Sequence, residues 1–175
     1  MPTPDLLAPN ALDAFPGGPY PADVVKAAGA AIRQVAGWHI APAASETITI
    51  ETSGGTALLL PTMHLVAIDE IRDVTNDPAG VVLEGYRTHA TERFEAGIVD
   101  RPGGWPYCGV LEVDIRHGHA ACPDDLKAVV AEICRKYLRG DLSQRSLGDK
   151  SESWRADLSV LSQQSLASYV IPGSP

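Results

Sequence analysis

The residues best suited to chemistry lie in one short stretch of the chain. His117, His119 and Cys122 place two imidazoles and a thiol within six residues, and groups of this kind can bind zinc. A fourth ligand is not found nearby at the spacing of a known zinc motif. Gly118 suggests another explanation, because its backbone freedom suits a tight exit from the preceding strand. We therefore expect a turn here, with no metal and no cofactor.

Acidic residues just before this stretch could act as a general acid and base. Glu112 and Asp114 are two residues apart on an expected strand, so their carboxylates share one face with Arg116. Alternating charged and apolar residues are also typical of a strand with one face in solvent, which is the interpretation we favour. The chain has no Gly-x-Ser-x-Gly, no His-Glu-x-x-His and no glycine-rich phosphate loop between a strand and a helix. A Ser-His-Asp or Cys-His set could still meet in space, but we expect that the protein is not an enzyme.

A third candidate is the pair Trp38 and His39, in the segment Gly37-Trp38-His39-Ile40-Ala41-Pro42. We interpret Trp38 as a core aromatic residue whose indole N–H bonds to backbone. His39 could be a ligand or a base, but we favour a histidine held by backbone groups. Gly37, Trp38, His39, Ile40 and Pro42 are therefore predicted to form a structural junction that fixes the angle between a helix and a sheet.

Length and composition indicate a single domain over residues 1–175, with an irregular arm (1–20), a core (21–140) and a C-terminal extension (141–175). The net charge of −8 argues against a surface that grips nucleic acid. The chain has no apolar run near the roughly 18 residues that span a bilayer, and its N-terminus does not resemble a signal peptide. Three cysteines cannot all pair, and we interpret them as buried or incidental thiols.

The helices predicted to frame the core cover residues 21–36 and 123–139. Each begins at a proline, which suits the first helical position, and each is followed by a glycine, Gly37 or Gly140. A short C-terminal helix is predicted to start at a Ser162 cap and run through Tyr169.

The strands are predicted to form an antiparallel β region inserted between the two long helices. Residues 45–51 and 56–60 are expected to pair as a hairpin around 52–55. A later strand alternates cleanly, with Leu111, Val113 and Ile115 inward. That strand is predicted over 109–116, and further strands are predicted over 65–74, 81–83, 93–99 and 152–158. The fold class is therefore predicted to be α+β, a small helical bundle with an inserted antiparallel β region.

The order of these features resembles the head-to-tail connector (adaptor) proteins of long-tailed bacteriophages, most closely those of phages that infect actinobacteria. The resemblance covers most of residues 20–172, and its most specific part is the segment from Gly37 to Pro42. Family members often carry tyrosine at the position of His119. The other matching features are the strand at 46–50, Leu58-Leu59-Leu60-Pro61, the strand at 66–74, His117-Gly118, Pro123-Asp124 and the segment 166–172.

The resemblance implies a virion structural protein at the head–tail junction, made in the host cytoplasm and without catalytic residues. Such adaptors form a ring, usually dodecameric, beneath the portal protein. They extend the DNA channel and present a surface to the stopper and tail-completion proteins. Double-stranded DNA would pass through the lumen without sequence-specific binding, and no membrane is involved. The rival interpretations are a stopper or tail terminator and, less favoured, a small intracellular hydrolase.

The resemblance also implies that the C-terminal segment reaches the portal or a neighbouring subunit. We expect the proline-rich arm and this tail to be buried only against neighbours. The residues predicted to form the interface are Trp154, Leu158, Leu161, Leu166, Tyr169 and Ile171.

The first prediction concerns Trp154. We expect Trp154→Ala to leave the subunit folded, as judged by thermal unfolding, and to weaken its association with the ring or the portal in a sedimentation assay. Assembly equal to that of the wild type would contradict C-terminal docking through this residue.

Overall fold

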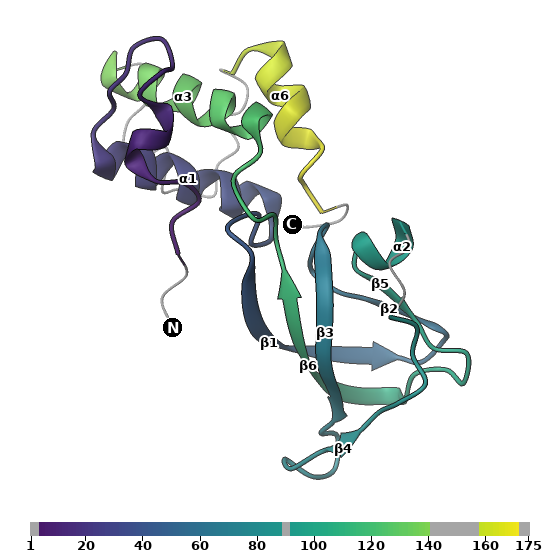
Figure 1. Ribbon diagram of the computed structural model, residues 1–175. Helices are drawn as coiled ribbons and strands as arrows, with labels where there is room; N and C mark the ends of the chain where they lie inside the picture. The colour runs from purple at the N-terminus through teal and green to yellow at the C-terminus, as the bar shows by residue number, and fades with distance from the viewer. Residues whose placement is uncertain (1–3, 89–91, 141–157, 172–175) are drawn as a thin grey trace. The chain divides into compact units, whose positions relative to one another are not determined.

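The computed structural model describes residues 4–88, 92–140 and 158–171. Its contacts divide the chain into two compact units (Figure 1). The helical unit comprises Met1–Pro42 and His119–Pro175, and the β unit comprises Ala43–Gly118. The β unit is therefore an insertion in the sequence of the helical unit, which confirms the α+β class with an inserted antiparallel β region. The expectation of a single domain stays a prediction.

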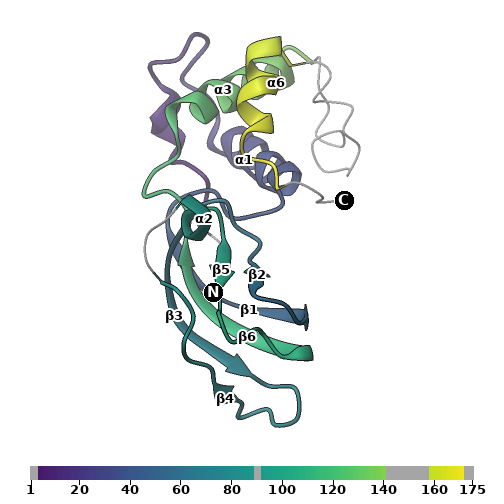
Figure 2. The same ribbon diagram turned by 90° about the vertical axis from the view of Figure 1, so that its right-hand side faces the viewer.

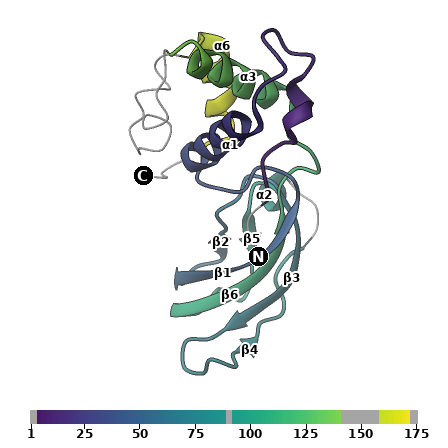
Figure 3. The same cartoon turned by 90° about the vertical axis from the view of Figure 1, so that its left-hand side faces the viewer.

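Three helices make up about half of the described helical unit. In the ribbon, α1 (Ala22–Ala36) and α3 (Asp124–Leu138) lie against each other, and α6 (Val160–Ala167) lies beside α3 (Figures 1 and 3). Gly37 ends α1 in the left-handed conformation, with a φ of 78°, as expected for a glycine that follows a helix. The two long helices are confirmed. Their buried apolar residues are Val24, Val25, Ala28, Ala31, Ile32, Ala36, Leu126, Val129, Val130, Ala131, Ile133 and Cys134.

The predicted start of the C-terminal helix is wrong by one turn. Ser159, not Ser162, caps α6, because the Ser159 side chain accepts a hydrogen bond from the Ser162 amide. Ser162 lies inside the helix and is buried, where its hydroxyl donates to Glu132 of α3 at 2.6 Å. A serine that faces a neighbouring helix cannot be told from a cap by type alone. The helix also ends at Ala167, so that Tyr169 lies in the following turn.

The N-terminal arm is packed rather than detached, which corrects the expectation that it is buried only against neighbours. A short 3-10 helix, η1 (Pro9–Leu12), is its one helical turn within residues 4–20. A Cβ added to Gly29 of α1 would lie 3.0 Å from the Cβ of Leu6, so this glycine permits the close approach of the arm. The arm therefore supplies apolar core to the helical unit of the same chain. Its buried residues are Leu6, Leu7, Leu12 and Tyr20.

The β unit contains a four-stranded antiparallel sheet and a two-stranded sheet. The larger sheet has the order β1 (Ala44–Ser53), β6 (Tyr107–His117), β3 (Leu65–Asp73), β4 (Val81–Val82). The smaller sheet pairs β2 (Ala57–Leu59) with β5 (Ile98–Asp100). The larger sheet is curved, and β2 and β5 lie on its concave side (Figures 2 and 3). Apolar residues from both sheets fill the space between them: Leu58, Leu60, Leu65, Ile71, Phe94, Val99, Trp105, Leu111, Val113 and Ile115.

The predicted hairpin between β1 and β2 is wrong. β1 pairs with β6 from Ala44 opposite His117 to Ser53 opposite Tyr107, whereas β2 pairs with β5. A partner as long as β6 offers β1 more cross-strand side-chain pairs than the three residues of β2 could offer. Long-range pairing therefore replaces the short-range hairpin.

Two other strand predictions also need correction. The segment 93–99 begins as a helix, α2 (Glu92–Glu95), and becomes extended only at β5. Phe94 of α2 is buried in the β core, which a helical turn allows as well as a strand does. The strand predicted over 152–158 lies outside the described residues except for Leu158. The strands predicted near 65–74, 81–83 and 109–116 are confirmed as β3, β4 and β6.

β3 carries two irregularities that its sequence pattern reflects. Its inward residues Leu65, Ile68 and Ile71 are three apart rather than two. The register with β6 shifts between Leu65 and Ala67 and again between Ile68 and Glu70. Each bulge adds one residue to β3, which restores the inward direction of the next apolar side chain.

One carboxylate accepts three hydrogen bonds that link α3 to the start of α6. Glu132 accepts hydrogen bonds from the Ser159 amide and hydroxyl, each at 2.8 Å, and from the Ser162 hydroxyl. Burial alone would raise the pKa of the Glu132 carboxyl, but the bonds from Ser162 and Ser159 and the charge of Lys136 outweigh it and lower the pKa below its ordinary value of 4.5.

We expect Glu132→Gln to lower the free energy of unfolding by about 1–2 kcal/mol at neutral pH, because a neutral amide accepts these bonds less well. A lowered pKa in the folded state means that this stabilisation is complete above the unfolded value and is lost as the pH falls through the folded one. The deficit of the variant should therefore shrink below pH 4.5 in chemical denaturation. Glu95→Gln, which changes an exposed carboxylate, is the control. A deficit that does not change with pH would contradict this account.

Candidate interaction surfaces

The predicted junction residues all belong to the helical unit. Trp38 is buried, and its indole N–H donates to the carbonyl of Tyr169 at 2.7 Å, which confirms the predicted bond to backbone. Nε2 of His39 donates to the carbonyl of Pro42, which confirms a histidine held by backbone. Ile40 is fully buried and accepts from the His119 amide at 2.8 Å. Whether these residues also fix the angle between a helix and a sheet stays a prediction.

Arg33 of α1 links the arm to the segment Gly37–Pro42, which we call the connector. Its guanidinium donates to the carbonyl of Pro4 at 2.5 Å and to the carbonyl of Ala41. Burial lowers the pKa of Arg33, partly offset by the charge of Asp5. Carbonyl oxygens bind this cation at the place where the arm and the connector meet α1.

Three rings form an aromatic cluster in the helical unit. The ring centroid of His119 lies 6.3 Å from that of Trp38 and 6.0 Å from that of Tyr169, with the last pair edge to face. The Tyr169 hydroxyl donates to Asp125 of α3 at 3.1 Å. Burial, followed by this hydrogen bond and the charge of Asp125, raises the pKa of Tyr169 to about 12. Tyr169 therefore links the C-terminal segment to Trp38, which precedes the β unit in the sequence, and to Asp125 of α3, which follows it.

The residues considered for zinc binding occupy separate environments. His117 is buried on β6, and its Nε2 lies 3.3 Å from Glu46 of β1. His119 belongs to the aromatic cluster. The Cys122 thiol is buried near the carbonyl of Pro123, and burial raises its pKa to about 11. A thiol that stays protonated is a poor metal ligand, and the described residues contain no group of three suitable side chains.

The carboxylates considered as an acid–base pair are bound to a cation. Nη2 of Arg72 lies 3.2 Å from Glu112 and 3.7 Å from Asp114, and its Nε lies 3.0 Å from Glu70. These side chains are on the partly exposed face of β6 and β3. The arrangement is a network of ion pairs across strands, in keeping with the predicted solvent face.

The predicted C-terminal interface residues differ in what they present. Leu161 has 76% of its surface exposed. Leu158 and Leu166 are buried under α6, and Tyr169 and Ile171 are half-buried. Ile171 donates its amide to Ala36 of α1 at 3.1 Å. These packed positions correct the expectation that the described part of the tail is buried only against neighbours, and Trp154 lies outside the described residues.

The outer side of α6 carries no charge and has two exposed aliphatic residues at its start, beside exposed glutamines. Val160, which the sequence did not single out, is 68% exposed beside Leu161. No residue from 158 to 171 carries a charge. Adjacent exposed aliphatic residues in an uncharged segment are typical of a surface that another protein covers. The clue in the sequence was the lack of charge rather than periodicity.

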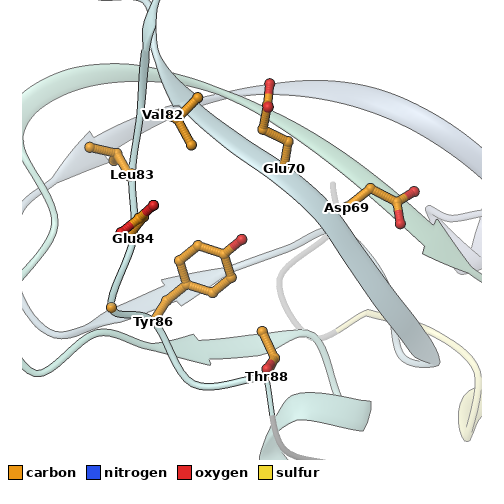
Figure 4. Close-up of a pocket in the computed structure, with 8 residues that line it drawn as sticks. Asp69, Glu70, Val82, Leu83, Glu84, Tyr86 and Thr88 are labelled. Atoms are coloured by element: carbon orange, nitrogen blue, oxygen red, sulfur yellow. The ribbon is translucent and has the colours of Figure 1, made fainter.

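An acidic hollow lies in the β unit (Figure 4). Its volume is about 320 Å³. Tyr86 stands inside it, with its ring stacked on Trp105 at a centroid distance of 6.2 Å. Burial, together with the charges of Glu70 and Glu84, raises the pKa of Tyr86. The residues that line the acidic hollow are Asp69, Glu70, Val82, Leu83, Glu84, Gly85, Tyr86 and Thr88.

A basic surface lies in the helical unit, where the arm meets the end of α3. This arginine patch is a depression of about 250 Å³. Tyr20 is buried beside the arginines and donates to Pro16 at 2.5 Å. Sequence analysis did not single out this patch or the acidic hollow, because each combines residues from segments whose contact no local pattern shows. The residues of the arginine patch are Pro16, Gly17, Tyr20, Arg135, Leu138 and Arg139.

Solved structures share this fold. A chain from the neck of an empty gene transfer agent (GTA) particle, computed with C6 symmetry, matches with a TM-score of 0.63 at 19% identity, over 100% of this chain and 97% of that chain. A chain from the neck of the native particle, computed with C12 symmetry, matches with a TM-score of 0.58 at 18% identity, over 87% and 85%. The fold is one found in particle necks.

A third solved structure shares the fold, and two comparisons of the sequence find no match. A chain from the virion of the native gene transfer agent particle matches with a TM-score of 0.53 at 20% identity, over 87% of this chain and 79% of that chain. No protein-family model matches, and no curated protein matches in sequence. In the part of the chain that the structure describes, no helix is long and apolar enough to cross a membrane.

The aromatic cluster leads to a prediction about the C-terminal segment. Trp38→Phe keeps an aromatic ring but removes the donor to Tyr169. We expect a loss of about 1 kcal/mol in unfolding free energy and faster hydrogen exchange at the Ile171 amide, measured by mass spectrometry. Trp105→Phe is the matched control, since it removes an indole bond to Val99 in the β unit. Unchanged exchange at Ile171 in Trp38→Phe would contradict a fixing role for this bond.

Proposed function

We propose that the protein is a head-to-tail adaptor of a phage or phage-like particle, which forms a ring beneath the portal. The observation that carries this proposal is the shared fold with neck chains over nearly the whole length of both chains. The C12 and C6 symmetries belong to those particles, and they support a ring of identical subunits here. The order of sequence features resembles phage adaptors independently of the fold.

The proposed partners are the portal protein, a stopper or tail-completion protein, and further copies of the same chain, twelve in the case of C12 symmetry. The ring would extend the DNA channel and let double-stranded DNA pass. A net charge of −8 suits a lumen that does not hold DNA, since like charges repel. The protein would act in the virion at the head–tail junction after synthesis in the host cytoplasm, with no catalytic role. A closer kinship with actinobacterial phages stays a prediction.

Among the residues that the structure describes, Val160 and Leu161 are the best candidates for contact with the portal or a neighbouring subunit. Their exposure on α6 would be costly for a lone subunit and is relieved by burial in an assembly. Leu158 and Leu166 instead hold α6 in place, because they are buried in the same chain.

Electron microscopy of negatively stained samples tests the proposed function. We expect rings when the purified protein is mixed with its portal, and the ring should cap the end of the portal that faces the tail. The protein alone is the comparison sample. Monomers in both samples would refute the proposal, and binding only to tail proteins would favour a stopper or tail terminator.

A charge on α6 tests the interface within that experiment. Leu161→Asp should weaken ring or portal association at least tenfold in sedimentation, while thermal unfolding stays near the wild type because the residue is exposed. Gln34→Asp adds the same charge at an exposed position of α1 and should have little effect. Equal behaviour of the two variants would remove Leu161 from the interface.

A further inference from the structure

The arginine patch holds two cations that no carboxylate neutralises among the described residues. Arg135 lies in the last turn of α3 and Arg139, four residues later, is its C-cap residue. The two side chains line the same depression, so their like charges repel each other. The Nε atom of Arg135 is buried and has no hydrogen-bond partner. Among the other lysines and arginines of the described ranges, five pair with carboxylates, Lys26, Arg72, Arg93, Lys127 and Lys136, and four form no such ion pair, Arg33, Arg87, Arg101 and Arg116. The buried Nε of Arg135 and its closeness to a second unpaired guanidinium therefore distinguish the patch.

The position of the patch at the end of α3 explains only in part why two arginines lie close together without a carboxylate among the described residues. The helix dipole favours cations near a C-terminus, but it does not satisfy a buried Nε. Leu138, between the two arginines, is 51% exposed, and Tyr20 borders the same depression. An aliphatic residue and a tyrosine around two arginines are typical of an interface.

The acidic hollow of the β unit has the complementary composition. The carboxylates of Asp69 and Glu84 form no ion pair within the described part of the chain, while Glu70 shares Arg72 with two other carboxylates. Val82 on the wall of the hollow is 52% exposed. Figure 4 shows Val82, Glu84 and Tyr86 on one side of the hollow and Asp69 and Glu70 across from them on β3.

We propose that the arginine patch of one copy of this chain docks into the acidic hollow of the next copy around the ring. The proposal rests on the proposed function, since only a ring of this chain requires it. A closed ring repeats a heterologous contact, in which two different surfaces of each subunit meet. The two surfaces are depressions of opposite charge, and what matches them is charge: each holds charged side chains that form no ion pair among the described residues, beside one exposed aliphatic residue.

A second copy is favoured over DNA as the occupant. Two guanidinium groups would also bind a phosphate, but the chain as a whole carries a charge of −8, and its field opposes DNA. The acidic hollow also needs cations, and the same chain supplies them. Exposed Leu138 and Val82 would become buried together in the protein contact, whereas a phosphate backbone would leave them in water.

Charge reversal with rescue tests the pairing. Arg139→Glu and Glu84→Arg should each weaken self-association at least tenfold, measured by sedimentation velocity with and without portal. The double variant Arg139→Glu/Glu84→Arg should recover most of the lost affinity, because the contact is restored with its charges exchanged. Arg116→Glu and Glu95→Arg are controls that make the same changes at exposed positions elsewhere. Thermal unfolding shows that each variant is folded.

The outcomes separate this proposal from the proposed function. Rings of wild type with no effect of either reversal, or with no rescue in the double variant, would overturn the docking and leave the adaptor function standing. A failure of the wild type to form rings with portal would overturn both. If Arg139→Glu instead weakened binding to duplex DNA in fluorescence anisotropy and left assembly intact, the patch would be a DNA contact and the docking proposal wrong.

Discussion

The helical unit depends on contacts between the segments that precede and follow the β unit in the sequence, and the backbone hydrogen bond from the His119 amide to the carbonyl of Ile40 lies where these segments meet. The two residues are far apart in sequence because the whole β unit lies between them. Bringing them together has a large loop-closure entropy cost, which local helix propensity cannot offset. The aromatic cluster and the bond from Trp38 to Tyr169 extend this contact to the C-terminal segment. α1 and α3, which lie on either side of the β unit in the sequence, can then share one core.

The two ends of the β unit are also brought together, in this case by strand pairing within the unit. Ala44 and His117, the first and last strand residues, are opposite each other in the β1–β6 ladder. The insertion thus begins and ends at adjacent positions and closes its own core between two sheets. Each unit has its own buried apolar core. Exposed aliphatic residues, and charges without an ion pair among the described residues, are therefore available as surfaces for other molecules.

Those surfaces differ in chemistry. The outer side of α6 exposes two adjacent aliphatic residues and carries no charge, whereas the arginine patch and the acidic hollow combine charges with one exposed aliphatic residue each. Apolar area contributes affinity, and complementary charge contributes orientation and selectivity. A subunit that must meet copies of itself and unlike partners at the same time needs surfaces of both kinds.

The sequence by itself determined the elements whose signals are local. Helical periodicity between a proline and a glycine identified α1 and α3, and strict alternation identified β6 with Leu111, Val113 and Ile115 inward. The backbone partners of Trp38 and His39 were also predictable, because a buried indole N–H or imidazole needs one. The partner of β1, the packing of the arm through Leu12 and the role of Ser162 were not. Alternation shows which face of a strand is buried, but cross-strand packing between distant segments selects its neighbour. The arginine patch and the acidic hollow likewise exist only after folding, since each requires side chains from separate segments to meet.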